Sequence, residues 1–238
     1  MNRAVADMRG VTLVEMAIVL LILGILTKAV MAPLSAVQGH RQHREATSQL
    51  ESIRRALWAH VVAGGVLPCP VVSSQRDDAD AAICRNARGG VPARRLGLSG
   101  ALDADGALLD PWNKPYNLAI SLSSHEERGV SELPDWTSIG EVSRVGIADL
   151  SADIVVCTQS VANRCPDNLV RASGLAFVVF STGPDDSTTG DQSENLDADS
   201  VFTAQESSID PEHPFDDLLL WGTAAETIFW LLRAGWLP

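Results

Sequence analysis

Hydrophobic residues are concentrated near the N-terminus, where residues 11–32 are almost wholly apolar. Charged side chains interrupt this run at Glu15, near its start, and at Lys28, near its end. At about 1.5 Å per residue, a helix of this length would be about 33 Å long. Because the hydrocarbon core of a bilayer is ~30 Å thick, the pattern predicts a transmembrane helix over residues 11–33.

A second helical pattern follows Pro33, a residue type that bends or breaks a helix. Beyond it, apolar residues recur at steps of three and four, which is the spacing of one helix face: Leu50, Ile53, Leu57 and Val61. This stripe predicts an amphipathic helix over residues 34–63 that packs against a globular domain. Gly64 and Gly65, followed by two prolines, are expected to end it.

The remainder of the chain, residues 64–238, carries shorter apolar segments. Residues 154–157 and 175–180 are continuous apolar runs, typical of buried strands. A further strand with alternating apolar residues is expected at 118–122. The fold class expected from these elements is α+β, with a long N-terminal helix, one half transmembrane and one half amphipathic, packed on a small antiparallel sheet.

A short helix is expected at the C-terminus. Thr223 and Glu226 have the spacing of a capping box, in which each residue satisfies a backbone N–H of the other. An apolar segment follows, and Gly235 is suited to the left-handed conformation that ends many helices.

The composition narrows the classes of function. The formal net charge is −12, and an acidic chain repels phosphate backbones, so no nucleic-acid partner is expected. No G-x-S-x-G nucleophile motif or phosphate-binding G-x-x-x-x-G-K-[ST] loop is present. The five histidines are scattered. We therefore expect no enzymatic activity.

Four cysteines are present: Cys69, Cys84, Cys157 and Cys165. An even number favours disulfides if the domain lies in an oxidising compartment. Three pairings are open, and the local one, Cys69–Cys84 with Cys157–Cys165, closes two short loops. A four-cysteine zinc site is the alternative, although the close ligand pairs typical of such sites are missing.

The segment Arg9-Gly10-Val11-Thr12-Leu13-Val14-Glu15 resembles the N-terminus of type IV pilins and type II secretion pseudopilins. The resemblance implies a leader peptide at 1–10 that a prepilin peptidase removes after Gly10. The new N-terminal amine, on Val11 where the family usually has Phe, would then be methylated. In the family, the residue matching Glu15 is thought to meet the amine of a neighbouring subunit during filament assembly.

An ordinary secretory signal peptide is the competing interpretation of this N-terminus. It also has a basic segment followed by an apolar one. Its cleavage site would follow the apolar run, and residues 29–32 could serve. A glutamate at the start of the apolar segment is unusual for a signal peptide and favours the pilin resemblance.

Two further segments extend the resemblance. Residues 110–116, Asp-Pro-Trp-Asn-Lys-Pro-Tyr, are similar to the D-P-W-G-x-P-Y element of major pseudopilins, with Asn113 in place of Gly. Major pseudopilins also carry a calcium-binding loop, and the acidic segment after residue 180 matches its outline. Asp185, Asp197 and Asp199 are the ligands this implies. A solvated acidic loop is the alternative, and no cofactor is otherwise expected.

Together these features predict a pilin-like, pseudopilin filament subunit of a type II secretion-like system. Its expected partners are the prepilin peptidase, other pilin or pseudopilin subunits and the inner membrane. It would be a single-pass protein of the bacterial inner membrane, with residues 64–238 as a periplasmic domain. The alternatives are a minor type IV pilin of a surface fibre and a secreted non-pilin protein behind a signal peptide.

Overall fold

The structure is a computed structural model. It describes residues 12–72, 84, 86–121, 135–138, 142, 150, 152–185, 191–197, 199–208 and 215–238, and it describes the side chains of the first helix outside positions 28–36. The predicted cleavage site at Gly10 and Val11 lies outside the described residues. The chain forms two compact units, Met1–Gln42 and His43–Pro238, and each is described by itself below.

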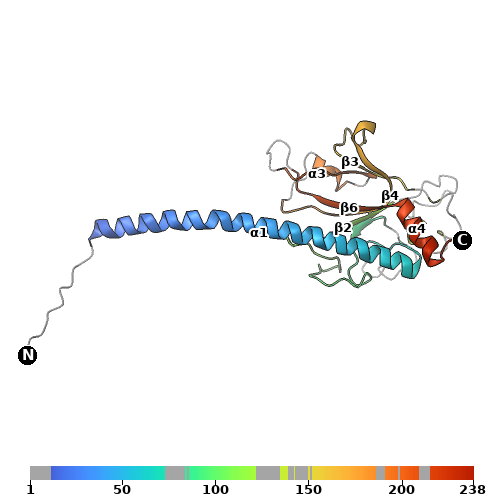
Figure 1. Ribbon diagram of the computed structural model, residues 1–238, viewed down its shortest axis with the longest axis horizontal. Helices are drawn as coiled ribbons and strands as arrows, with labels where there is room; N and C mark the ends of the chain where they lie inside the picture. Colours follow the sequence, from blue (N-terminus) through green and yellow to red (C-terminus); the bar gives the residue numbers. More distant parts are fainter. Residues whose placement is uncertain are drawn as a thin grey trace, which may run out of the picture. The chain divides into compact units, whose positions relative to one another are not determined.

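The longest element is α1, Leu13–Gly64, which contributes to both units (Figure 1). Its first turn is capped, because the Thr12 hydroxyl accepts a hydrogen bond of 3.2 Å from the Glu15 N–H. The helix is continuous across Pro33.

In the part of the chain that the structure describes, no helix has both the length and the apolar character needed to cross a membrane. The prediction of a transmembrane helix over 11–33, and with it a single-pass inner-membrane location with a periplasmic domain, is therefore wrong.

In the second unit, the end of α1 buries the predicted apolar stripe. Leu50, Ile53, Leu57 and Val61 are at most 1% exposed and form the main core with residues of the sheet. Trp58 of α1 contacts the ring of Phe177 edge-on, with 5.0 Å between the ring centroids.

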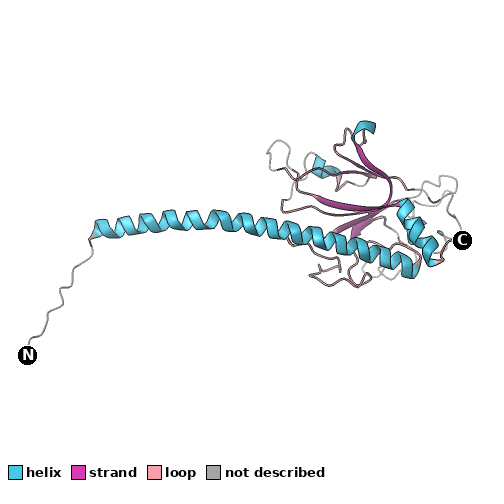
Figure 2. Cartoon of the chain, viewed as in Figure 1, coloured by secondary structure: helices cyan, strands magenta, loops and turns pink. Residues whose placement is uncertain are grey.

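Within the described residues, six strands form one sheet, and Figure 2 shows strands in magenta. Their bounds are β1 Arg88–Gly90, β2 Asn117–Ile120, β3 Ile154–Cys157, β4 Val170–Ser181, β5 Val201–Thr203 and β6 Leu218–Thr223. The order is β1-β2-β4-β3-β5, with β6 also paired to β4. The long strand β4 is therefore the centre of the sheet, and it pairs with β2, β3 and β6.

The sheet is mixed, so the predicted antiparallel sheet is wrong. Strand β5 pairs with β3 in parallel, with Val155 opposite Val201 and Cys157 opposite Thr203. A parallel pair needs a long connection between its strands. Here the chain passes through β4 and the segment 182–200 between them, which is long enough to return β5 in the direction of β3.

The remaining elements are short: the 3₁₀ turns Asp135–Thr137 and Asp167–Leu169, α3 Asp191–Glu194 and α4 Ala224–Ala234. The predicted capping box is present on α4, where the Glu226 N–H donates to Thr223 Oγ1 over 3.1 Å. The helix ends at Gly235, whose φ is +79°. Trp236 then donates to the Val62 carbonyl over 3.0 Å and holds the C-terminus against α1.

The turn at 110–116 is organised by the Asp110 carboxylate. Its Oδ1 accepts hydrogen bonds of 2.9 Å from the backbone N–H groups of Trp112 and Lys114, and its Oδ2 accepts one of 2.6 Å from Ser181 on β4. Asn113 has a φ of +71°, a conformation in which Asn is the best substitute for Gly. This explains why Asn can stand where the similar element has Gly.

Both short-loop disulfides are formed. The Cα atoms are 5.3 Å apart in Cys69–Cys84 and 5.7 Å apart in Cys157–Cys165. The structure therefore selects the local pairing and leaves no cysteine for a four-cysteine zinc site.

Candidate cation site

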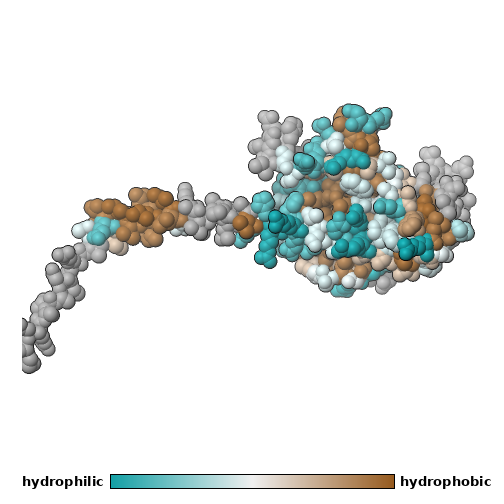
Figure 3. Space-filling view, viewed as in Figure 1, coloured by the Kyte–Doolittle hydropathy of each residue, from teal (hydrophilic) through white to brown (hydrophobic). Residues whose placement is uncertain are grey.

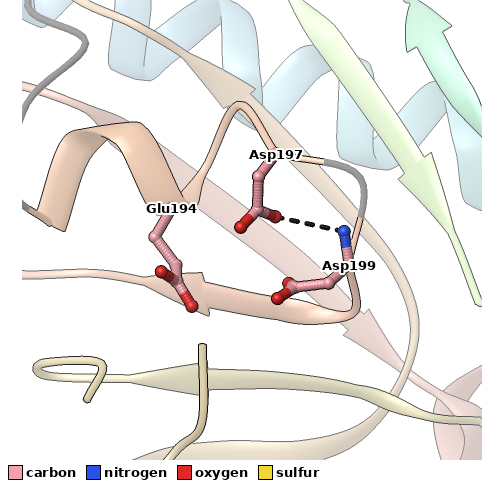
Figure 4. A group of neighbouring side chains, drawn as sticks. All are labelled: Glu194, Asp197 and Asp199. Carbon is pink, nitrogen blue, oxygen red and sulfur yellow. Dashed lines mark hydrogen bonds between the residues drawn. The ribbon is translucent and has the colours of Figure 1, made fainter. Parts of the chain in front are cut away.

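Three carboxylates converge between α3 and β5. Ligand oxygens of Glu194, Asp197 and Asp199 all lie within 4.8 Å of one another. Figure 4 shows Glu194 at the end of α3 and the two aspartates on the segment that leads into β5, with their carboxylates pointing toward a common space. We call these three residues the acidic cluster.

The local sequence explains how the carboxylates of Asp197 and Asp199 are oriented. Aspartate side chains readily accept hydrogen bonds from backbone N–H groups two residues later. Asp197 Oδ1 accepts from the Asp199 N–H over 3.1 Å, and Asp199 Oδ1 accepts from the Val201 N–H over 2.8 Å. These two successive turns fix both carboxylates at the start of β5.

The structure brings together two of the three predicted ligands. Asp185 is not part of the acidic cluster. Its backbone N–H donates to Asp216 Oδ2 over 3.1 Å, and its carbonyl accepts from Lys114. Glu194 was not among the predicted ligands, because its membership of the acidic cluster depends on the single turn of α3 that precedes Asp197.

Glu194 is the most enclosed member of the acidic cluster. Its side chain is 6% exposed, and no described residue donates a hydrogen bond to its buried Oε1. Burial raises the pKa of Glu194, a hydrogen bond from the Ser160 side chain lowers it, and the nearby aspartates raise it. Burial also raises the pKa of Asp199, and Asp197 adds to that rise. A carboxylate oxygen left without a donor in this setting is poorly stabilised by the protein alone.

Arg88 of β1 provides a positive charge beside the acidic cluster. Its guanidinium donates to the Asp197 carbonyl over 2.6 Å and lies over the Phe202 ring at 4.5 Å from the centroid. Burial lowers the pKa of Arg88, and the charges of Asp197 and Asp199 raise it. Counting these described residues alone, three ionised carboxylates and the Arg88 guanidinium carry a net charge of −2, which a divalent cation would neutralise.

A second buried polar group lies next to the acidic cluster. Asn195 accepts from the Thr203 N–H over 2.8 Å and donates to the Thr203 carbonyl over 3.0 Å and to Asp217 Oδ2 over 2.6 Å. It therefore joins β5 to the segment before β6. Burial raises the pKa of Asp217 to about 7, an effect that the Asn195 hydrogen bond opposes and the charge of Asp216 increases.

In the first unit, the notable feature is an exposed apolar surface on α1, which we call the apolar row. Each of its large side chains is between 45% and 87% exposed, and Figure 3 shows this part of the helix in brown. Its members are Leu13, Val14, Met16, Ile18, Val19, Leu20, Leu21, Ile22, Leu23, Ile25 and Leu26. Glu15 lies at its start, in the first turn of the helix.

Comparisons of this chain with protein-family models, with curated proteins and with solved structures found no match. The resemblance of residues 9–15 and 110–116 to pilins and pseudopilins therefore stays a prediction.

Proposed function

We propose that the protein is a filament subunit of the pilin and pseudopilin type, serving a type II secretion-like system and processed after Gly10. One observation carries the proposal: the apolar row is exposed in the isolated chain. An exposed apolar surface of this kind marks a contact with a partner. A filament covers such a row by packing the N-terminal helices of successive subunits against one another.

Glu15 gives this packing its specificity. A carboxylate at the start of an apolar row is poorly solvated once other helices cover it, so it needs a positive partner. Processing after Gly10 would create one, because the amine of Val11 then becomes the N-terminus of each subunit. A helix N-terminus adds positive potential at the same place. The role requires no catalysis by this chain.

Substitution of Glu15 tests the proposal. The mature protein is expected to begin at Val11, and Glu15→Leu is expected to be processed normally but to stay out of the filament. Glu51→Leu makes the same change further along α1 and should assemble normally. Each variant is co-expressed with the other subunits, the N-terminus is sequenced, and the purified filaments are probed for the chain. A mature N-terminus after residue 32, or normal assembly of Glu15→Leu, would contradict the proposal.

We also propose that the acidic cluster binds calcium. Ca²⁺ takes six to eight oxygen ligands and favours carboxylates, and the three side chains supply them at one place. Glu194 is only 6% exposed, and its Oε1 accepts no hydrogen bond from a described residue. This buried oxygen is independent support for a bound ligand at the acidic cluster. The net negative charge of the acidic cluster and Arg88 also favours binding of a divalent cation.

Thermal unfolding of the full chain tests the calcium proposal. Calcium at 100 times its dissociation constant is expected to stabilise the fold by about 2.7 kcal/mol. Glu194→Gln should lose most of this gain, whereas Glu206→Gln, which changes an exposed carboxylate, should keep it. Equal melting temperatures of the wild-type protein in calcium and in chelator would refute calcium binding.

A further inference from the structure

The loop between Cys157 and Cys165, which we call the disulfide loop, reaches the acidic cluster. It leaves the end of β3, and its two cysteines are bonded to each other. Asn163 donates from Nδ2 to Asp197 Oδ2 over 3.2 Å. Ser160, on the same loop, lies close enough to Glu194 for its side chain to lower the pKa of that carboxylate. The disulfide loop therefore contacts Asp197 directly and brings a second neutral side chain beside Glu194.

Packing alone does not hold the disulfide loop in this conformation. Most of its residues are exposed, and Val161 is 58% exposed. Ala162 and Asn163 have φ values of +51° and +55°, a region that non-glycine residues rarely adopt and that is unfavourable for Ala. Val161 and Arg164 exchange two backbone hydrogen bonds, of 2.9 and 3.2 Å. The Cys157–Cys165 bond is the covalent constraint that favours this compact turn over extended alternatives.

Asn163 and Ser160 of the disulfide loop carry side-chain oxygen atoms, which are the ligands that calcium prefers. Three carboxylates leave part of a six- to eight-oxygen shell unfilled. An amide carries a donor on one side and an acceptor oxygen on the other, and a hydroxyl is both donor and acceptor. Asn163 and Ser160 can therefore donate to the carboxylates when the cluster is empty and present oxygen when a cation is present.

We propose that the disulfide loop is part of the cation site. It supplies the amide oxygen of Asn163 and the hydroxyl oxygen of Ser160, and the Cys157–Cys165 bond positions both. The proposal rests on the calcium site proposed above and extends it: calcium affinity depends on a disulfide whose sulfur atoms do not touch the ion.

The first test is calcium titration of the full chain by isothermal calorimetry. Cys157→Ser/Cys165→Ser is expected to bind calcium about 10- to 100-fold more weakly than the wild-type protein, the range typical of lost supporting contacts around a metal. Cys69→Ser/Cys84→Ser removes the other disulfide and is the matched control, with unchanged affinity expected. Circular dichroism confirms that each variant is folded at the temperature of the titration.

Variants of Asn163 provide a second test that leaves both disulfides intact. Asn163→Gly accepts the left-handed backbone conformation but lacks the amide, and it is expected to bind calcium about tenfold more weakly. Asn163→Asp keeps an oxygen at the same position, adds a negative charge, and should bind at least as tightly as the wild-type protein. This pair decides the outcome if the Cys157→Ser/Cys165→Ser protein does not fold.

The possible results separate this inference from the calcium proposal. No calcium binding by the wild-type protein overturns both. Wild-type binding with the same affinity in Asn163→Gly overturns the role of the disulfide loop and leaves calcium binding by the acidic cluster in place. Weaker binding in Asn163→Gly, restored in Asn163→Asp, supports the loop as part of the site.

Discussion

Replacing Asp217 by Asn is expected to stabilise the protein by about 2–4 kcal/mol at pH 8 and by less than about 1 kcal/mol at pH 4, because each unit of pKa shift corresponds to about 1.4 kcal/mol. Asp217 is 6% exposed, and Asn195 Nδ2 donates to it over 2.6 Å. Burial raises the pKa of Asp217 most, the charges of Asp216 and Asp185 raise it further, and the charge of Lys114 lowers it. Burial without an adequate cation makes the ionised form costly.

The sign follows from proton binding in the two states. The pKa of Asp217 is about 7 in the folded protein and 3.8 in the absence of the fold. Between these values the folded state holds a proton that the unfolded state has released, so this group lowers the stability as the pH rises from about 4 to about 7. The introduced asparagine side chain would be neutral in both states and accept the same hydrogen bond from Asn195. The stability of the variant therefore does not fall as the pH rises through this range.

Urea unfolding of the full chain at several pH values measures the difference. Asp167→Asn removes an exposed carboxylate and controls for the change in net charge. A stability difference between wild type and Asp217→Asn that is the same at pH 4 and pH 8 would show that folding does not raise the pKa of Asp217.

Substituting Ala for Gly222 is expected to destabilise the fold by about 2–3 kcal/mol, the cost of overfilling a tightly packed core. Gly222 lies on β6 opposite Phe177 of β4. A Cβ at this position would overlap the Phe177 ring and would lie 2.6 Å from Cζ2 of Trp58. The strand can pass beneath the edge-on Trp58–Phe177 pair because residue 222 has no side chain.

Gly64→Ala is the matched control, because the nearest atom that its Cβ would meet is His60 Nε2 at 4.0 Å. It should leave the free energy of unfolding unchanged or slightly higher. Phe177→Leu combined with Gly222→Ala should cost less than the sum of the two single changes, because the leucine frees space for the new methyl group. A loss below about 0.5 kcal/mol for Gly222→Ala, or strict additivity in the double variant, would contradict the packing argument.

Features set by interactions between near neighbours along the chain could be predicted from the sequence. The stripe from Leu50 to Val61 forms because side chains three and four residues apart share a helix face. The capping box at Thr223 and Glu226 joins groups three residues apart. Strands β3 and β4 were expected from short runs of apolar and β-branched residues, and the turn at 110–116 from its prolines and asparagine.

The full membership of the acidic cluster could not be predicted from local sequence patterns. Asp197 and Asp199 could be paired from their spacing, but the exclusion of Asp185 depends on its contacts with Asp216 and Lys114, which are distant in the sequence. The contribution of Asn163 depends on a contact spanning 34 residues. Spacing along the chain carries no information about such contacts, because they depend on which elements the fold places side by side.

Local sequence patterns are sufficient to predict the amphipathic end of α1, the two buried strands and the cap of α4, because the interactions responsible act between residues close together in the chain. Only the folded chain shows that β5 runs parallel to β3, that Asp217 is buried and that Glu194 completes the acidic cluster. It also overturned the transmembrane assignment of residues 11–33, which rested on hydropathy and length alone. Burial, strand direction and the meeting of distant carboxylates are properties of packed elements, and packing is settled only when the whole chain is folded.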